Sequence, residues 1–404
     1  MIKISDIVNA LSGIMFLSKW YAQDSSKRDS RLWTFGAWDG MRYSDNSRAL
    51  YEYVLLNCPQ IKAVWMTKSD TVYQRLHDAN MPVVKCGSSE AHHIQQQAGY
   101  FFLTKGPEDS EPRYMHGCNL IWLWHGMPLK QIGRDAMAFQ RKNTLFKRFK
   151  TRIRKVTVPW EFLDGPTLST SGFFIPFLQS AFALQGSNVW NVGLPRNDNF
   201  FKTDFVEDII GNLHRKFDRP SQPVRLVLYM PTHRDKSTRE GHPFNPFDEA
   251  GFDVAALDEI LEKGNYILLY KGHFFDSSNN GVNSSSRIIT VSDQSYDDMY
   301  TFIKDVDILI TDYSSIYFDF LLCNKPVILF PFDEEDYVHN SRPFYFDYSL
   351  LEGAHVYSWK ELCQCLAEET YYVPSQKTKH LFNDYCDGNS CKRIVEMITE
   401  NIIK

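Results

Sequence analysis

The sequence predicts an α/β protein with two doubly wound, Rossmann-like domains that face each other across a cleft. Strand-like and helix-like runs alternate in two series along the chain, and the linker DRPSQP at 218–223 precedes the second series. Such alternation is typical of βαβ units. The strand-like runs of the second series, RLVLYM, YILLY, DILIT and PVILF, are continuously apolar, which is typical of parallel strands covered by helices on both faces.

The first series lies between about 30 and 130. Its expected strands and helices are, in order, RLWTFGAW, SRALYEYVLLN, IKAVWMT, SDTVYQRLHDA, MPVVKC, SEAHHIQQQA, YFFLT and LIWLWHG. We therefore expect a first domain over 1–198.

The second series begins after the linker. Its expected elements, which alternate between strand and helix and begin with a strand, are VRLVLYMP, FDVAALDEILEKG, YILLYKGH, SYDDMYTFIKDV, DILITDYSS, IYFDFLLCN and KPVILFPF. A second domain is expected over 199–375, followed by closing helices over 376–404. Because such sheets bind ligands beyond the carboxyl ends of their strands, functional residues are expected in the loops that follow strands.

The composition is that of an ordinary folded protein. The 404 residues suffice for two or three domains, and the hydrophobic fraction of 43% excludes a disordered chain. The net charge of −5 indicates no class of partner. The apolar run at 7–17 is shorter than the roughly 20 residues that a membrane-spanning helix needs and lacks a signal-peptide pattern, so neither secretion nor a spanning helix is expected.

The eight cysteines lack the paired spacing of a disulfide framework or a zinc site. Cys363 and Cys365 are close in sequence, but no second pair or histidine follows at ligand distance. We expect buried free thiols in a reducing cytoplasm, and no structural metal.

Two loops after strands of the second series carry positively charged side chains. The PTHRD loop contains Thr232 and Arg234, and a guanidinium is suited to binding phosphate oxygens in a bidentate fork. A surface ion pair between Arg234 and Asp235 is the alternative. The KGH loop contains Lys271 and His273, which could neutralise a leaving phosphate. A hydrogen-bonded loop histidine without catalytic function is the alternative there.

A third loop, DYSS, connects the buried strand DILIT to the helix IYFDFLL. Its residues Asp312, Ser314 and Ser315 place hydroxyls and backbone N–H groups at the start of a helix, where a phosphate binds favourably. A plain helix cap is the alternative. Neither an Asp-x-Asp metal signature nor a Walker loop accompanies these residues.

The fourth loop, HGMPLK, ends a very hydrophobic strand of the first series. Gly126 permits a close backbone approach, and Pro128 is compatible with the first turn of a helix. In the predicted cleft His125 faces the loops of the second domain and is placed to act as a general base toward an acceptor hydroxyl. A loop histidine without a chemical role is the alternative.

These stretches resemble the CDP-glycerol glycerophosphotransferase family of teichoic-acid primases and polymerases. The matching stretches are WHGMPLKQIGRD (124–135), GLPRND (193–198), YMPTHRD (229–235), ILITDYSSIYFDF (308–320), KPVILFPFDEEDY (325–337) and RPFYFDY (342–348). The stretch at 35–54 resembles the family's first strand and helix. The resemblance implies a glycosyltransferase-B-like fold and transfer of glycerol phosphate from CDP-glycerol to an acceptor hydroxyl, with release of CMP.

The resemblance also implies roles for individual residues. His125 corresponds to the histidine treated as the base, and His273 to a second functional histidine. Arg234, Ser314 and Ser315 correspond to contacts of the donor diphosphate, to which we add Thr232 and Asp312 from the same two loops.

The sequence departs from the family at two positions, and several alternatives stay open. His233 stands where the family often has Trp, and Phe274 follows the KGH histidine. CDP-ribitol is an alternative donor, and assistance by Mg²⁺ is left open. A nucleotide-sugar glycosyltransferase of the same fold and a non-catalytic nucleotide- or lipid-binding scaffold are alternative functions. The short chain favours a primase slightly over a polymerase.

A basic stretch, RKNTLFKRFKTRIRK at 141–155, contains eight Lys or Arg and no acid. Its apolar residues fall approximately on one helical face, which predicts a basic amphipathic helix on an anionic membrane surface. Basic residues near such a surface contribute about 1 kcal/mol each. The residues expected to contact the acceptor or the membrane are Lys130, Lys147, Arg148, Lys150 and Arg152.

The resemblance implies an acceptor saccharide linked to polyprenyl diphosphate. We therefore expect a peripheral enzyme on the cytoplasmic face of the cell membrane, in teichoic-acid-like or capsular polymer synthesis. A solvated basic helix is the alternative for 141–155, and nucleic acid is not expected because no recognised binding module is present.

Overall fold

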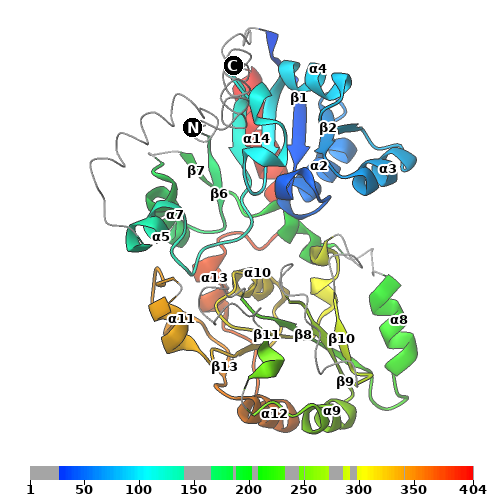
Figure 1. Ribbon diagram of the computed structural model, residues 1–404, viewed down its shortest axis with the longest axis vertical. Coiled ribbons are helices and arrows are strands. Elements are labelled where there is room, and N and C mark those ends of the chain that lie inside the picture. Colours follow the sequence, from blue (N-terminus) through cyan, green and yellow to red (C-terminus); the bar gives the residue numbers. More distant parts are fainter. Residues whose placement is uncertain are drawn as a thin grey trace, which may run out of the picture.

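The computed structural model describes residues 27–140, 165–184, 188–202, 208–232, 245–249, 251–272, 285–291, 298–340 and 342–403. Its described strands form two parallel sheets with helices packed around them, and the two halves lie one above the other in Figure 1. The predicted α/β fold with two doubly wound sheets is confirmed.

The first sheet has the strand order β3-β2-β1-β4-β5-β6-β7. Its strands are β1 (Asp29–Gly36), β2 (Lys62–Thr67), β3 (Val83–Lys85), β4 (Ala98–Leu103), β5 (Asn119–Trp122), β6 (Thr167–Ser169) and β7 (Val189–Asn191). Large side chains such as Trp33 and Trp65 are fully buried in the core beneath it. The order reverses between β1 and β4, so the loops after these strands flank the position where such sheets bind ligands.

The second sheet repeats this winding with the order β10-β9-β8-β11-β12-β13. Its strands are β8 (Arg225–Met230), β9 (Tyr266–Tyr270), β10 (Ile288–Thr290), β11 (Ile308–Thr311), β12 (Val327–Leu329) and β13 (Ala354–His355). Strands β9, β11 and β12 are buried along their whole length, as the continuous apolar runs predict. The reversal here lies between β8 and β11.

Helices pack around both sheets. In the first half they are α2 (Asp45–Asn57), α3 (Asp70–Asp78), α4 (Ser89–Gln97), α5 (Gly133–Gln140) and α7 (Ile175–Phe182). In the second half they are α8 (Asp208–Phe217), α9 (Val254–Lys263), α10 (Ile316–Phe320), α11 (Glu334–Asn340) and α12 (Trp359–Glu368). Within the described residues no helix has both the length and the apolar character needed to cross a bilayer.

The helix predicted over 295–306 is wrong in its described part, which forms two short 3-10 turns, Met299–Thr301 and Ile303–Asp305. Met299, Tyr300, Phe302 and Ile303 are all buried. Neighbouring residues buried in several directions do not fit the one-sided apolar stripe of a surface helix.

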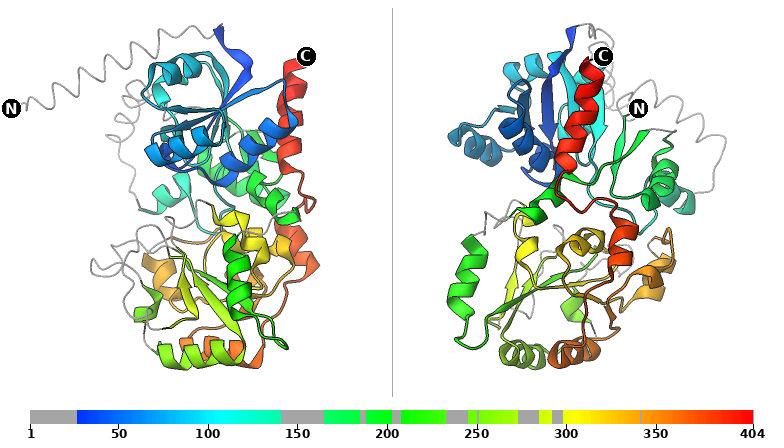
Figure 2. Two further views of the ribbon diagram at one scale, coloured as in Figure 1. Left: turned by 90° about the vertical axis from the view of Figure 1, so that its right-hand side faces the viewer. Right: turned by 180° about the vertical axis from the view of Figure 1, so that it is seen from behind.

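The C-terminal segment returns to the first half. Helix α13 (Gln376–Phe382) lies near the junction of the halves, and α14 (Ser390–Ile403) runs along the first half (Figure 2). The Asp198 carboxylate accepts hydrogen bonds from the backbone N–H groups of Ser390 and Cys391, at 2.9 and 2.8 Å. The start of α14 is thereby attached to the 3-10 segment Pro195–Phe201.

Candidate functional site

The loop that carries His125 follows β5 and is tightly turned. Trp124 and Gly126, on either side of the histidine, have φ angles of 58° and 138°. The imidazole packs against two indole rings, with centroid distances of 5.5 Å to Trp38 and 4.1 Å to Trp124. The position of His125 is therefore determined by its backbone turn and by the rings around it.

The hydrogen bond of His125 leaves one ring nitrogen available as a base. Nδ1 lies 3.3 Å from the carbonyl oxygen of Thr104. Because a carbonyl oxygen can only accept, this bond requires the hydrogen on Nδ1 and leaves the lone pair on Nε2. Burial lowers the pKa of His125 below its usual value, although the Asp45 carboxylate acts in the opposite direction. A neutral imidazole with a free Nε2 is suited to general base catalysis near pH 7.

Asp109 holds the loop after β4, in which the carbonyl oxygen of Thr104 accepts the hydrogen bond from His125. The Asp109 carboxylate accepts hydrogen bonds from the N–H groups of Thr104, Lys105, Gly106 and Asp39, at 2.8, 2.6, 3.3 and 2.7 Å. Burial raises the pKa of Asp109 to about 6, against the effect of these donors. One buried side chain thus connects the loops after β1 and β4, at the point where the strand order of the first sheet reverses.

The loop of the predicted base, His125, touches the predicted donor loop of the second half. A Cβ atom placed on Gly126 would lie 2.5 Å from Oγ and 2.9 Å from Cβ of Ser315. Ser315 immediately precedes α10, and its side chain makes no capping hydrogen bond to that helix. Ser314 and Ser315 are both partly exposed. The two loops thus lie against each other at Gly126 and Ser315, and the Ser315 hydroxyl does not cap α10.

Asp312 is the first residue of the predicted donor loop, DYSS, and is buried. Its Oδ1 accepts hydrogen bonds from the N–H groups of Thr232 and Tyr313, at 2.7 and 2.6 Å. Its carbonyl oxygen accepts one from the Tyr348 hydroxyl at 3.1 Å. The carboxylate therefore connects the loops after β8 and β11, at the reversal point of the second sheet.

Lys130 lies at the junction of the two halves. Its backbone forms an antiparallel bridge with Phe344, and its ammonium donates to Oγ1 of Thr232 at 3.4 Å. Next to it, the N–H of Tyr345 donates to the carbonyl oxygen of Leu129 at 2.8 Å. The structure therefore places this predicted acceptor or membrane residue beside the donor-side loop that contains Thr232.

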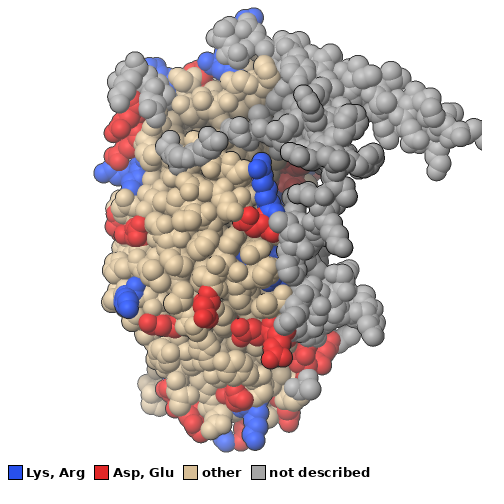
Figure 3. All heavy atoms as spheres, turned by 90° about the vertical axis from the view of Figure 1, so that its left-hand side faces the viewer, with Lys and Arg blue, Asp and Glu red and all other residues tan. Residues whose placement is uncertain are grey.

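The remaining predicted site residues lie outside the described residues. These are Arg234, His273, Lys147, Arg148, Lys150 and Arg152, together with the basic stretch 141–155 and the apolar run at 7–17. In the part of the chain that the structure describes, no group of three His, Cys, Asp or Glu side chains could hold a metal ion. On the face shown in Figure 3, the described Lys and Arg side chains are scattered rather than gathered into a patch.

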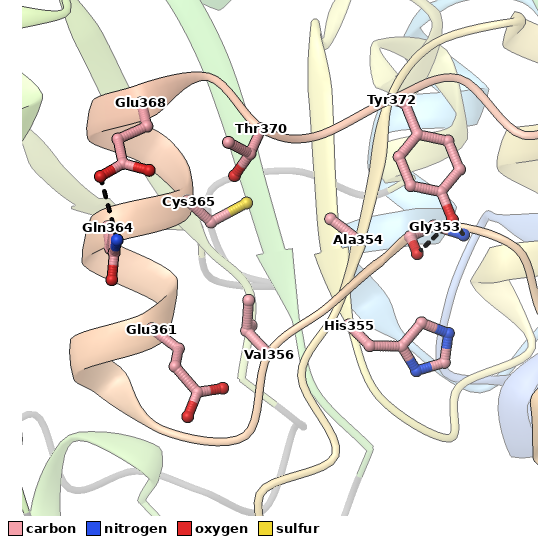
Figure 4. A pocket seen from close by; sticks show the side chains of 10 residues that line it. All are labelled: Gly353, Ala354, His355, Val356, Glu361, Gln364, Cys365, Glu368, Thr370 and Tyr372. Carbon is pink, nitrogen blue, oxygen red and sulfur yellow. Dashed lines mark hydrogen bonds between the residues drawn. The ribbon is translucent and has the colours of Figure 1, made fainter.

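A separate pocket of about 500 Å³ lies between α12 and the edge strand β13 (Figure 4). It is lined by ten residues, none of them a predicted site residue. The carboxylates of Glu361 and Glu368 are among them, and they would repel a diphosphate. The loops around His125 and Ser315 are therefore the better candidate for the active site.

Sequence reasoning missed two groups of residues around these loops. Asp109 was not singled out, because one of three acidic residues in the loop GPEDSEP (106–112) gives no pattern. Arg196, within GLPRND, was given no role, yet its buried side chain forms ion pairs with Asp45 of the first half and Asp319 of the second, at 2.8 and 2.7 Å. The membership of Arg196 in a family motif was the available signal.

A family model and curated relatives agree on one family. The family model described as CDP-Glycerol:Poly(glycerophosphate) glycerophosphotransferase matches residues 19–400. The chain is 28% identical over 380 residues to the teichoic acid glycerol-phosphate transferase of Staphylococcus aureus, which covers 90% of this chain and 92% of that protein. It is also 28% identical over 316 residues to the teichoic acid poly(glycerol phosphate) polymerase of Bacillus subtilis, and there it spans only 40% of the relative's length.

Solved structures of the wall teichoic acid polymerase TagF have a similar fold. One superposes with a TM-score of 0.73 at 21% identity, and the match covers 100% of this chain and 99% of that chain. A variant of TagF soaked with CDPG superposes with a TM-score of 0.72. The likeness supports the architecture of two Rossmann-like units.

Proposed function

Because the chain belongs to the CDP-glycerol:poly(glycerophosphate) glycerophosphotransferase family, we propose that it transfers glycerol phosphate from CDP-glycerol to a hydroxyl of a lipid-linked acceptor, with release of CMP. The process it serves is teichoic acid synthesis. The observation that carries the site assignment is the close approach of Gly126 and Ser315. It brings the loop of the proposed base, His125, against the loop of the proposed donor contacts.

The proposed reaction is an in-line displacement at the β-phosphorus of CDP-glycerol. Nε2 of His125 removes the proton from the acceptor hydroxyl, whose oxygen forms the new bond to phosphorus. The bond from phosphorus to the CMP oxygen breaks, and CMP leaves with the electron pair. Such a transfer depends on positioning and electrostatics more than on covalent catalysis.

The proposed donor contacts come from the DYSS, PTHRD and KGH loops. Ser314 and Ser315 offer hydroxyls beside the start of α10, which continues as a 3-10 turn to Cys323. Arg234 and His273 would add positive charge on the diphosphate and the departing CMP. Thr232 and Asp312 support these contacts by holding the loops in place.

A donor screen tests the proposed reaction. The enzyme is incubated with a synthetic prenyl-diphosphate-linked saccharide and with CDP-glycerol, CDP-ribitol or nucleotide sugars. CMP release with glycerol phosphate incorporation is expected from CDP-glycerol, and incorporation only from nucleotide sugars would contradict the proposal.

His125→Ala tests the proposed base and is expected to lower kcat at least about 100-fold, the lower end of general base contributions. His355→Ala is the matched control, because His355 also bonds to a backbone carbonyl, that of Leu351 at 3.1 Å, and lines the separate pocket. A scaffold without activity would show no difference between the two variants.

The acceptor and the membrane location are further parts of the proposal. We propose peripheral binding to the cytoplasmic face of the membrane through the basic stretch 141–155, which would hold the anionic lipid of the acceptor near His125. Charge reversal at Lys147, Arg148 and Lys150 should abolish binding to vesicles containing phosphatidylglycerol. Neutral vesicles serve as the control, and unchanged binding to anionic vesicles would refute this assignment.

A further inference from the structure

A buried cluster of charges lies between the two halves, beside the base loop. The guanidinium of Arg196 donates to Oδ1 of Asp45 at 2.8 Å and to Oδ2 of Asp319 at 2.7 Å. Asp319 also accepts hydrogen bonds from Nδ2 of Asn197 at 2.9 Å and from the Tyr300 hydroxyl at 2.7 Å. All of these side chains are less than a tenth exposed. One arginine thus joins α2 of the first half to α10 of the second.

The backbone of Arg196 reaches the base loop through a single asparagine. The N–H of Arg196 donates to Oδ1 of Asn46 at 3.1 Å. Nδ2 of Asn46 donates in turn to the carbonyl oxygens of Leu123 and Trp124, at 3.3 and 2.9 Å. These carbonyls belong to the two residues before His125, and Trp124 has a φ of 58°. Asn46 therefore holds the strained turn that presents the imidazole.

The same contacts extend to the donor loop. Asp319 belongs to α10, the helix that begins directly after Ser315. A Cβ on Gly126 would meet both the Ser315 side chain and Nη2 of Arg196, the latter at 3.2 Å. A continuous set of bonds therefore leads from the helix after Ser315, through Asp319, Arg196 and Asn46, to the peptide before His125.

We propose that Asn46 and Arg196 are positioning residues for the transfer, which hold the His125 loop and the Ser315 helix in one fixed geometry. The proposal rests on the proposed function, because it takes His125 as the base and Ser315 as a donor contact. Buried ion pairs often contribute little net stability compared with apolar residues of similar volume. What this cluster supplies is a defined geometry, and a displacement of about 1 Å between reacting groups can cost roughly 100-fold in rate.

Asn46→Asp tests the proposal, because it keeps the shape of the side chain but removes the donor to both carbonyls. The chain offers a matched control in Asn265. This residue is also fully buried, and its Nδ2 donates to the carbonyl oxygens of Phe217 and Gln222, at 3.2 and 2.7 Å. Its Oδ1 accepts from Arg287 at 3.2 Å. Asn265 directly precedes β9 and so lies at the amino ends of the strands, whereas the site lies at their carboxyl ends.

Both variants should lose thermal stability to a similar extent, because each leaves two carbonyls without their donor. Only Asn46→Asp should lower kcat, by at least about tenfold, with little change in KM for CDP-glycerol. The new carboxylate lies near His125, so rates are compared on the plateau of the pH profile, where the base is neutral in every variant. A loss that persists on the plateau comes from position rather than from charge.

If Asn46→Asp does not fold, Arg196→Lys carries the same expectation, because lysine keeps the charge but lacks the planar fork by which Arg196 donates to Asp45 and Asp319. Arg287→Lys is then the control. A wild-type kcat in the folded Asn46 or Arg196 variant overturns the proposal, and so does an equal kcat loss in the matching control. If the wild-type enzyme releases no CMP from CDP-glycerol, the proposed function fails first, and the inference fails with it.

Discussion

Replacement of Gly126 by alanine tests the contact on which the site depends. The backbone of Gly126 has a φ of 138°, a conformation that residues with a Cβ rarely adopt. The added methyl would also lie 2.5 Å from Oγ and 2.9 Å from Cβ of Ser315. Rotation of the hydroxyl relieves only the first of these contacts, because the Cβ of Ser315 is fixed to the backbone at the start of α10.

The expected loss of stability follows from the unfavourable backbone conformation and from the steric overlap with Ser315. A backbone held in a sparsely populated region costs about 1–3 kcal/mol, and overpacking costs typically a further 1–3 kcal/mol. Because the clashing atoms belong to different halves, displacement of one loop from the other relieves the strain. We therefore expect the free energy of unfolding to fall by about 2–6 kcal/mol if the loops stay in contact. If they move apart instead, kcat should fall by roughly 100-fold or more.

The assay combines denaturant unfolding with CMP release from CDP-glycerol. Gly87→Ala is the control, because Gly87 also has a positive φ, 88°, but a Cβ there would meet nothing within 4 Å. The control should cost only about 1–2 kcal/mol of stability and leave kcat unchanged. If Gly126→Ala behaves like Gly87→Ala in both measurements, the base loop and the Ser315 loop are not in contact, and the site assignment is wrong.

Four further predictions concern residues of the proposed site and of the junction between the two halves. The rate should fall as pH decreases through the pKa of His125, with a midpoint below the usual histidine value because burial disfavours the charged ring. In a pH–rate profile Asp45→Asn should move that midpoint lower still, because the Asp45 carboxylate raises the pKa of His125. Asp312→Ala should reduce the free energy of unfolding by about 2–6 kcal/mol, because two backbone N–H groups lose their acceptor. Tyr345→Phe should cost only about 1–2 kcal/mol, from the lost 2.7 Å bond to Asp135, without changing KM for CDP-glycerol.

Most of the fold could be predicted because its signals are local. The apolar runs that became β8, β9, β11 and β12 are visible in any short window of sequence. Strands β6, β7, β10 and β13 have two or three residues each and, unlike the equally short β12, do not stand inside a longer continuous apolar run. The family resemblance, predicted from motifs in the loops, is confirmed by the family model that matches residues 19–400.

The site could be predicted only in part, and the reason is sequence separation. That the loops of His125 and Ser315 face each other followed from topology, since each loop comes after a strand of a doubly wound sheet. The roles of His125, Ser314 and Ser315 stay predictions until variants are measured. The partners of Asp109 and Asn46 include residues 70 and 150 positions away, and no local pattern identifies such pairs.

The residues that act on a substrate and the residues that hold them differ in how visible they are in a sequence. His125 is conspicuous because a polar ring directly after an apolar strand needs an explanation. Asn46 is inconspicuous because a polar residue in the first turn of a helix is ordinary, and only the structure shows that its amide bonds to the base loop rather than to water. In a phosphoryl transfer the protein contributes mainly position and charge, so we expect such side chains to affect the rate together with the base.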